Sequence, residues 1–154
     1  MPKKIFPEES SLITKAPLIR RLMAMLYDTL ICAALMLVTT GIYTAISYEF
    51  TGAESTSGDP LLSSILFITL YLFFAYFWTR SGQTLGMQVW HLRIQNEDST
   101  SISWLQALLR FFMAIISFIP AGAGYFWMLA DKDKKAWHDR FSESVVVRIP
   151  KKKS

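Results

Sequence analysis

The sequence is poor in cysteine, histidine and charged residues, and each shortage excludes a class of protein. Only 18% of its 154 residues are charged, whereas a soluble domain usually carries about 25%. The single cysteine, Cys32, can form no disulfide within the chain and belongs to no cysteine-based metal motif. With two histidines, no nucleophile elbow and no zinc-protease motif, we expect no enzymatic activity, no cofactor and no metal.

Nucleotides and nucleic acids are poor candidates for binding partners. The glycine-bracketed turn at 82–86 lacks the further glycines and the preceding strand of a phosphate-binding fingerprint. The net charge is +4 and the pI about 9.3, but the basic residues lie beside apolar runs, which favours membrane topology over phosphate binding. The first apolar run, of about 25 residues, is too long for the core of a cleaved signal peptide, so we expect none.

Apolar residues are abundant, at 52% hydrophobic and 14% aromatic, with a mean hydropathy of +0.30. The run at 22–46 contains no charge except Asp28 and would extend roughly 37 Å as a helix, enough to cross a bilayer core of about 30 Å. The run at 61–79 is uncharged, and the run at 104–130 is interrupted at 120–124 by proline and glycine. The pattern predicts an all-α membrane protein, a small bundle of two firm transmembrane helices plus a third bent or re-entrant segment.

Short polar segments flank this transmembrane domain of residues 16–149. Residues 1–15 are predicted to be a disordered cytoplasmic tail, and residues 150–154 a basic C-terminal tail. Residues 89–95 alternate partly with a period of two, and residues 145–149 are rich in valine. We expect these two segments to pair as a short cytoplasmic two-stranded element.

Charge asymmetry predicts the orientation of the chain in the membrane. Residues 1–21 carry five Lys or Arg and two acids, whereas the loop at 47–60 carries three acids and no base. Cationic segments stay in the cytoplasm, so the N-terminus is expected inside and this loop outside. The tail from residue 131 has eight bases and is also expected inside, which requires the third segment to enter and return. A plain three-span protein with an external tail stays open as the alternative.

A few charged residues accompany the apolar runs and form a candidate polar cluster. Arg21 and Asp28 are seven residues apart, which places both on one face of a helix, roughly 10 Å apart along its axis. A charge at membrane depth costs from about 2.5 kcal/mol upward, so a partner is expected. Arg110 is a second candidate partner, and Asp139, at the inner membrane surface in this topology, could reach either arginine.

These residues resemble the signature of the RDD family of bacterial integral membrane proteins, named for one arginine and two aspartates. Arg21 and Asp28 match the pair at the first span, and Asp139 matches the second aspartate. Residues 82–87 and 92–94 are similar to the stretch that follows the second span. The resemblance covers nearly the whole chain from residue 16 to 149. It implies a multi-pass protein of the bacterial cytoplasmic (inner) membrane, whose surroundings are the lipid bilayer.

Three roles stay open for the cluster. Transport, including sodium/proton exchange, is suggested for some members of the family, and Asp28 could exchange a proton with a cation while Arg21 modulates it. Alternatively, Arg21, Asp28, Asp139 and Arg110 form a buried ion-pair network that only fixes helix packing. The third reading is a non-transport accessory or assembly protein. Because so few spans make a small pore, we expect a homo-oligomer or a membrane partner protein.

Overall fold

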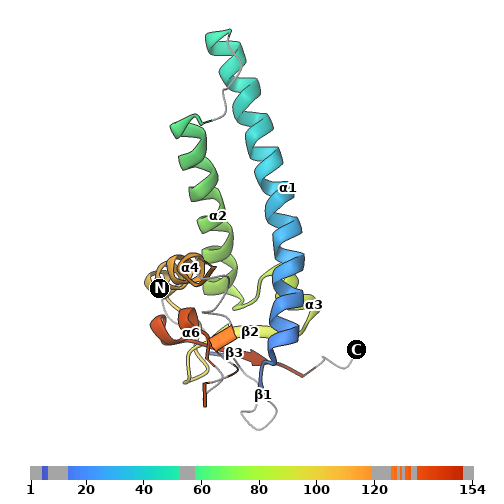
Figure 1. Cartoon of the computed structure of the whole chain (residues 1–154), viewed down its shortest axis with the longest axis vertical. Helices are drawn as coiled ribbons and strands as arrows, with labels where there is room; N and C mark the ends of the chain where they lie inside the picture. The colour runs from blue at the N-terminus through green and yellow to red at the C-terminus, as the bar shows by residue number, and fades with distance from the viewer. Residues whose placement is uncertain are drawn as a thin grey trace.

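Two long helices stand on a base of short helices and a small sheet (Figure 1). The computed structural model describes residues 5–6, 14–52, 58–118, 126–127, 129, 131–132 and 135–150. The interruption predicted at 120–124 lies outside the described residues, as do most of the predicted N-terminal tail and residues 151–154 of the basic tail.

The two long helices are α1 (Leu18–Thr51) and α2 (Pro60–Arg80). Both are long and apolar enough to cross a membrane, and only 11% of the apolar window of each is buried. The core helix of a soluble protein would be mostly buried, whereas here Leu37 is 74% exposed and Leu61 60% exposed. Such continuous apolar surface is costly in water and is what lipid accommodates. The two predicted spans therefore correspond to two candidate membrane-spanning helices, which run beyond the predicted limits.

The ends of α1 and α2 have local causes. Helix α1 ends at Gly52, whose φ of 65° is left-handed and whose N–H donates to the Tyr48 carbonyl at 2.9 Å. Helix α2 begins at Asp59, whose carboxylate accepts from the Leu61 N–H at 2.9 Å. The same carboxylate accepts the Tyr43 hydroxyl at 2.5 Å. This contact ties the two helices together at the end remote from the sheet.

The sheet combines strands from distant parts of the chain. It contains β1 (Thr14–Lys15), β2 (Leu92–Gln95) and β3 (Val145–Arg148), in the order β1-β3-β2 with antiparallel neighbours. The predicted pairing of the segments at 89–95 and 145–149 is confirmed. The expectation of two strands is wrong, because Thr14–Lys15 adds a third. A strand of two residues pairs through its main chain and is too short to show an alternating side-chain pattern in the sequence. The sheet gathers both terminal segments at one end of the long helices.

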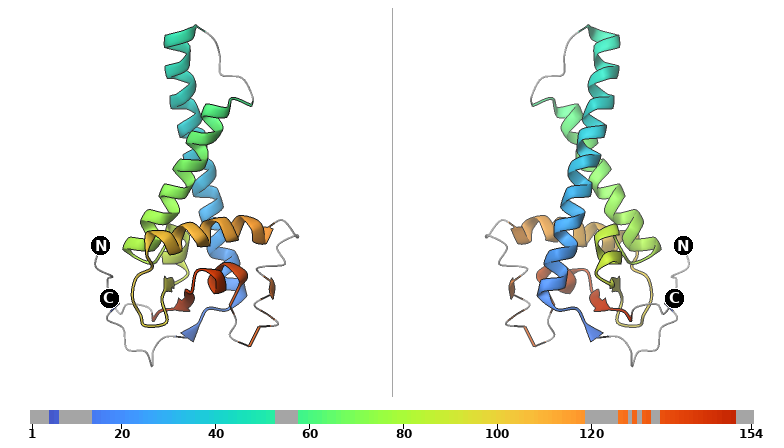
Figure 2. Two further views of the ribbon diagram at one scale, coloured as in Figure 1. Left: turned by 90° about the vertical axis from the view of Figure 1, so that its left-hand side faces the viewer. Right: turned by 90° about the vertical axis from the view of Figure 1, so that its right-hand side faces the viewer.

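The third apolar segment, predicted to be bent or re-entrant, is described only in part, because the predicted bend at 120–124 lies outside the described residues. Its longest described element is helix α4 (Trp104–Phe118) of 15 residues, which at about 22 Å is too short to cross a bilayer by itself; residues 126–127 and 129 are also described. Figure 2 shows α4 lying across the lower ends of α1 and α2. One face packs inward through Ala107 and Phe111, and another exposes Leu105 and Leu109. Helix α4 therefore lies crosswise with apolar side chains both toward the base and on its outer face.

Aromatic packing attaches α4 to α2. The Phe111 ring lies 5.5 Å from the Phe67 ring and 5.7 Å from the Tyr71 ring, both in edge-on geometry. The short helices α3 (Leu85–Val89) and α6 (Trp137–Phe141) complete the base. The buried core lies there too, formed by Ala16, Ala24, Ala75, Trp78, Leu92, Ile94, Ile102, Ala107, Phe111 and Val146.

Candidate functional site

Asp139 is the most deeply buried charged side chain of the site, with no exposed surface. It lies in α6, and its carboxylate forms ion pairs with Arg21 of α1 and, at 2.6 Å, with the Arg110 Nη1 of α4. It also accepts the Ala136 N–H at 3.2 Å. A single carboxylate thus joins a candidate spanning helix, the crosswise helix and the short helix α6.

Each arginine has further partners around Asp139. The Arg110 Nη1 donates to the Ser144 hydroxyl at 2.8 Å, and its guanidinium lies 5.5 Å from the centre of the Trp78 ring. The Arg21 Nη2 reaches the Val146 carbonyl at 3.4 Å. These contacts hold the two guanidinium groups in the buried base of the fold. The structure therefore brings together three of the four predicted site residues, Arg21, Arg110 and Asp139.

His138 adds a titratable group to this ion-pair cluster. Its Nε2 lies 3.5 Å from the Asp139 carboxylate. Burial lowers the pKa of His138 to about 3; the Asp139 charge raises this pKa, while the charges of Arg110 and Arg21 lower it further. The ring is therefore neutral at physiological pH. His138 was not among the predicted site residues, although it directly precedes the predicted Asp139 in the sequence.

The carboxylate of Asp139 is ionised at physiological pH. Burial alone would raise its pKa, but the charge of Arg110, then that of His138 when protonated, and then Arg21 hold the pKa of Asp139 well below its usual range. Two guanidinium charges consequently face one carboxylate charge in this cluster. Over the described residues, this ion-pair cluster therefore carries more positive than negative charge.

Asp28, the fourth predicted residue, has a different environment. Its carboxylate accepts the Thr84 hydroxyl at 2.5 Å and the Gly86 N–H at 2.9 Å. Among the described residues these are its hydrogen-bond partners, while the two arginines considered as its partners, Arg21 and Arg110, pair with Asp139. Although Arg21 and Asp28 share a helix face, Arg21 pairs with Asp139 and Asp28 faces the turn after α2.

Gly86 is required for this contact with Asp28. A Cβ atom there would lie 2.3 Å from the Ala24 carbonyl oxygen and 2.9 Å from the Asp28 carboxylate. Helix α3 can therefore approach α1 closely only with glycine at this position. Thr84 and Gly86 were not predicted as partners of Asp28. They lie in the glycine-bracketed turn at 82–86, which was the visible sign of a close backbone approach here.

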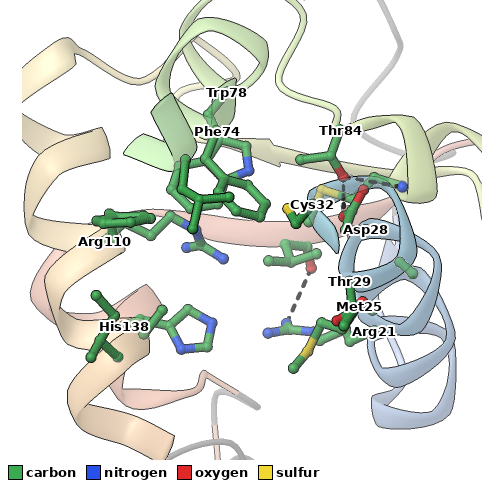
Figure 3. A pocket seen from close by; sticks show the side chains of 17 residues that line it. Arg21, Met25, Asp28, Thr29, Cys32, Phe74, Trp78, Thr84, Arg110 and His138 are labelled. Atoms are coloured by element: carbon green, nitrogen blue, oxygen red, sulfur yellow. Dashed lines mark hydrogen bonds between the residues drawn. The ribbon is translucent and has the colours of Figure 1, made fainter. Parts of the chain in front are cut away.

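The two groups of polar residues border one cavity of about 310 Å³. Arg21 and Asp28 reach it from α1, Arg110 from α4 and His138 from α6 (Figure 3). Its other walls are mainly apolar side chains of α1, α2 and α4. A mostly apolar cavity with a few convergent ionisable groups is the common form of a small-molecule binding site.

This fold and site indicate a class: a small helical membrane protein with an arginine–aspartate cluster at the base of two apolar helices. The chain belongs to the RDD family, whose family model matches residues 15–143. The matched region includes Arg21, Asp28 and Asp139, so the resemblance seen in the sequence is confirmed at the level of the family. No curated protein and no solved structure matches the chain.

Proposed function

We propose that this RDD protein binds a small ligand or ion in the cavity and takes part in its transport. The observation that carries the proposal is the presence of an aspartate and two arginines on the wall of one cavity beside the candidate spanning helices. Intramembrane ionisable residues commonly mark ion or substrate pathways. Asp28 is the candidate exchanging group for a proton or a cation, because its carboxylate borders the cavity outside the Asp139 ion pairs.

Replacing Asp28 by Asn should abolish this transport, because the amide cannot carry a proton or neutralise a cation. Purified protein in liposomes holding a pH-sensitive dye would be exposed to gradients of several alkali cations. We expect cation-dependent proton flux for the wild type and the background of empty vesicles for Asp28→Asn. Glu97→Gln removes an exposed acid remote from the cavity and should keep the wild-type flux. Absence of flux in the wild type under every gradient would remove the proposal.

An accessory or assembly protein is the second candidate. The observation in its favour is that Asp139 ties α1, α4 and α6 together, as a network fixing helix arrangement would do. On this reading the cytoplasmic base would dock a partner protein. A chain without flux that co-purifies with one stable membrane partner would favour it.

We also propose that the protein lies in the bacterial inner membrane as a multi-pass protein with both termini in the cytoplasm. Support comes from β1 and β3, which pair although one precedes α1 and the other follows α6. The charges agree, since residues 1–21 carry five bases against two acids and residues 47–60 carry three acids and no base. Two crossings, by α1 and α2, then suffice.

A reporter enzyme active only in the cytoplasm should be active when fused after Ser154. A second reporter, active only outside the cytoplasm, should be silent at that position and active when inserted in the acidic loop at 53–57. The reverse result at the C-terminus would refute the two-crossing arrangement.

A further inference from the structure

The Arg110 end of the cavity holds hydrogen-bond donors that the protein itself does not use. Arg110 is only 3% exposed, and Figure 3 shows its guanidinium directed into the cavity. Its Nη1 serves Asp139 and Ser144, but within the described part of the chain no hydrogen bond uses its Nε or Nη2. The Arg110 side chain lines the cavity, so donors left over from its contacts with the protein are available to an acceptor on a ligand there.

Positive charge exceeds negative charge at this end of the cavity over the described residues. Among the described residues, the ion pairs of Arg21 and Arg110 share the Asp139 carboxylate, and the neighbouring His138 ring is neutral at physiological pH. Asp28 borders the cavity elsewhere, where Thr84 and Gly86 already satisfy its carboxylate. The site beside Arg110 therefore favours an anionic ligand. A guanidinium group binds carboxylate or phosphate oxygens well.

The remaining walls suit a hydrocarbon chain. Leu70 and Phe74 of α2 face the cavity together with Phe111 and Ile115 of α4. The cavity is partly open and lies among helices whose outward faces are apolar. A free inorganic anion would leave these apolar walls without contacts, whereas an anion with an apolar body would contact both the walls and the arginine.

We propose that the cavity binds an anionic amphiphile, with its acidic head at Arg110 and Arg21 and its hydrocarbon part between α2 and α4. The inference rests on the proposed function only in that the cavity holds a ligand; the anion occupies the Arg110 end, apart from the proton or cation exchange proposed at Asp28. The shared chemistry is a carboxylate or phosphate head on an apolar chain. Its source is a free fatty acid or an anionic phospholipid.

Trp78 lines the cavity and provides the reporter, because bromine quenches tryptophan fluorescence only at close range. Protein in detergent micelles would be titrated with brominated stearate and, in parallel, with brominated stearyl alcohol of the same chain length. Saturable quenching by the acid, absent in Trp78→Phe and at least about tenfold weaker for the alcohol, supports the proposal. Equal quenching by acid and alcohol overturns it.

A second pair of probes separates the two sources of the anion. Phosphatidylglycerol with brominated chains is compared with brominated phosphatidylcholine, whose head has no net charge. Stronger quenching by phosphatidylglycerol than by stearate assigns a phospholipid, and the reverse assigns a fatty acid; either supports the proposal. Absence of quenching by both anions overturns it.

Two variants test the position of the head and of the chain. Arg110→Gln should weaken anion binding about 30-fold, because it removes one partner of a buried charged contact. Since that variant also disturbs the Asp139 pairs, Ala114→Phe is the second test: Ala114 lines the cavity and has no part in the ion pairs. The larger side chain should block quenching while far-ultraviolet circular dichroism stays unchanged. Unaltered quenching in Ala114→Phe would place the anion elsewhere and overturn the proposal.

Asp28→Asn separates this inference from the proposed function. The inference expects Asp28→Asn to retain anion binding, because Asp28 repels rather than holds the head, whereas the transport proposal expects flux to be lost. Anion binding without flux in the wild type would remove transport and leave the ligand class standing. Flux without charge-dependent quenching would remove the ligand class alone.

Discussion

Asp139→Asn should lower the free energy of unfolding by about 3–5 kcal/mol, the cost of removing one partner from a buried ion pair. Asp139 has no exposed surface, and its carboxylate pairs with both Arg21 and Arg110. Asparagine keeps the size of the side chain but removes the negative charge that both guanidinium groups share. Unfolding in mixed micelles, followed by circular dichroism, measures the loss.

Glu97→Gln is the matched control for this substitution. Glu97 also pairs with a base, Lys135, at 2.5 Å, but its side chain is 71% exposed. Solvent screens such a pair, so the control should leave stability close to that of the wild type. If Asp139→Asn is as mild as this control, the ion-pair cluster does not hold the base together.

A double substitution identifies the cause of the loss. If loss of the shared negative charge is what destabilises Asp139→Asn, then adding Arg110→Gln should restore part of the stability, because it removes one of the two guanidinium charges. Simple addition of the two single losses would instead indicate independent packing defects.

Stability should fall by about 2 kcal/mol between pH 7.5 and pH 5 because of His138. The pKa of this ring is lowered by burial from 6.5 to about 3 in the folded chain. The unfolded chain therefore takes up a proton as the pH falls through 6.5, whereas the folded chain does so only near pH 3. A depressed folded pKa in a histidine thus destabilises the fold progressively across this window.

His138→Gln should flatten the stability profile between pH 7.5 and pH 5, with unfolding measured at several pH values in one detergent. Asp139 does not interfere in this window, because its pKa is below its usual range in the folded chain and its own contribution is lost only at lower pH. A wild-type profile that is already flat, or an equal slope in the variant, would contradict a buried neutral His138.

The two aspartates of the site, Asp139 and Asp28, differ in their suitability for proton exchange. Asp139 is neutralised by two arginines and is a poor candidate for proton exchange near neutral pH. Asp28 has no such cationic partner among the described residues and borders the cavity. The proposed transport chemistry therefore rests on Asp28 and the proposed anion site on Arg110, while Asp139 holds the surrounding helices.

The sequence by itself determined the features that depend on local composition. Two apolar runs of sufficient length predicted α1 and α2, valine-rich and alternating segments predicted the pairing of β2 with β3, and short motifs around Arg21, Asp28 and Asp139 indicated the RDD family. Each of these signals is contained in a few neighbouring residues. The apolar run from Trp104 left the course of the third segment open, because hydropathy alone does not distinguish a spanning helix from a crosswise one such as α4.

Only the tertiary structure decided which charges meet. Arg21 and Asp139 are 118 residues apart, and no periodicity encodes their contact. Arg21 and Asp28 share a helix face, yet the close packing of α3 at Gly86 supplies Asp28 with neutral donors and α6 supplies Arg21 with its carboxylate. The physical reason is that long-range pairing follows from how the helices pack around the buried base, whereas hydrophobic length and turn chemistry act locally.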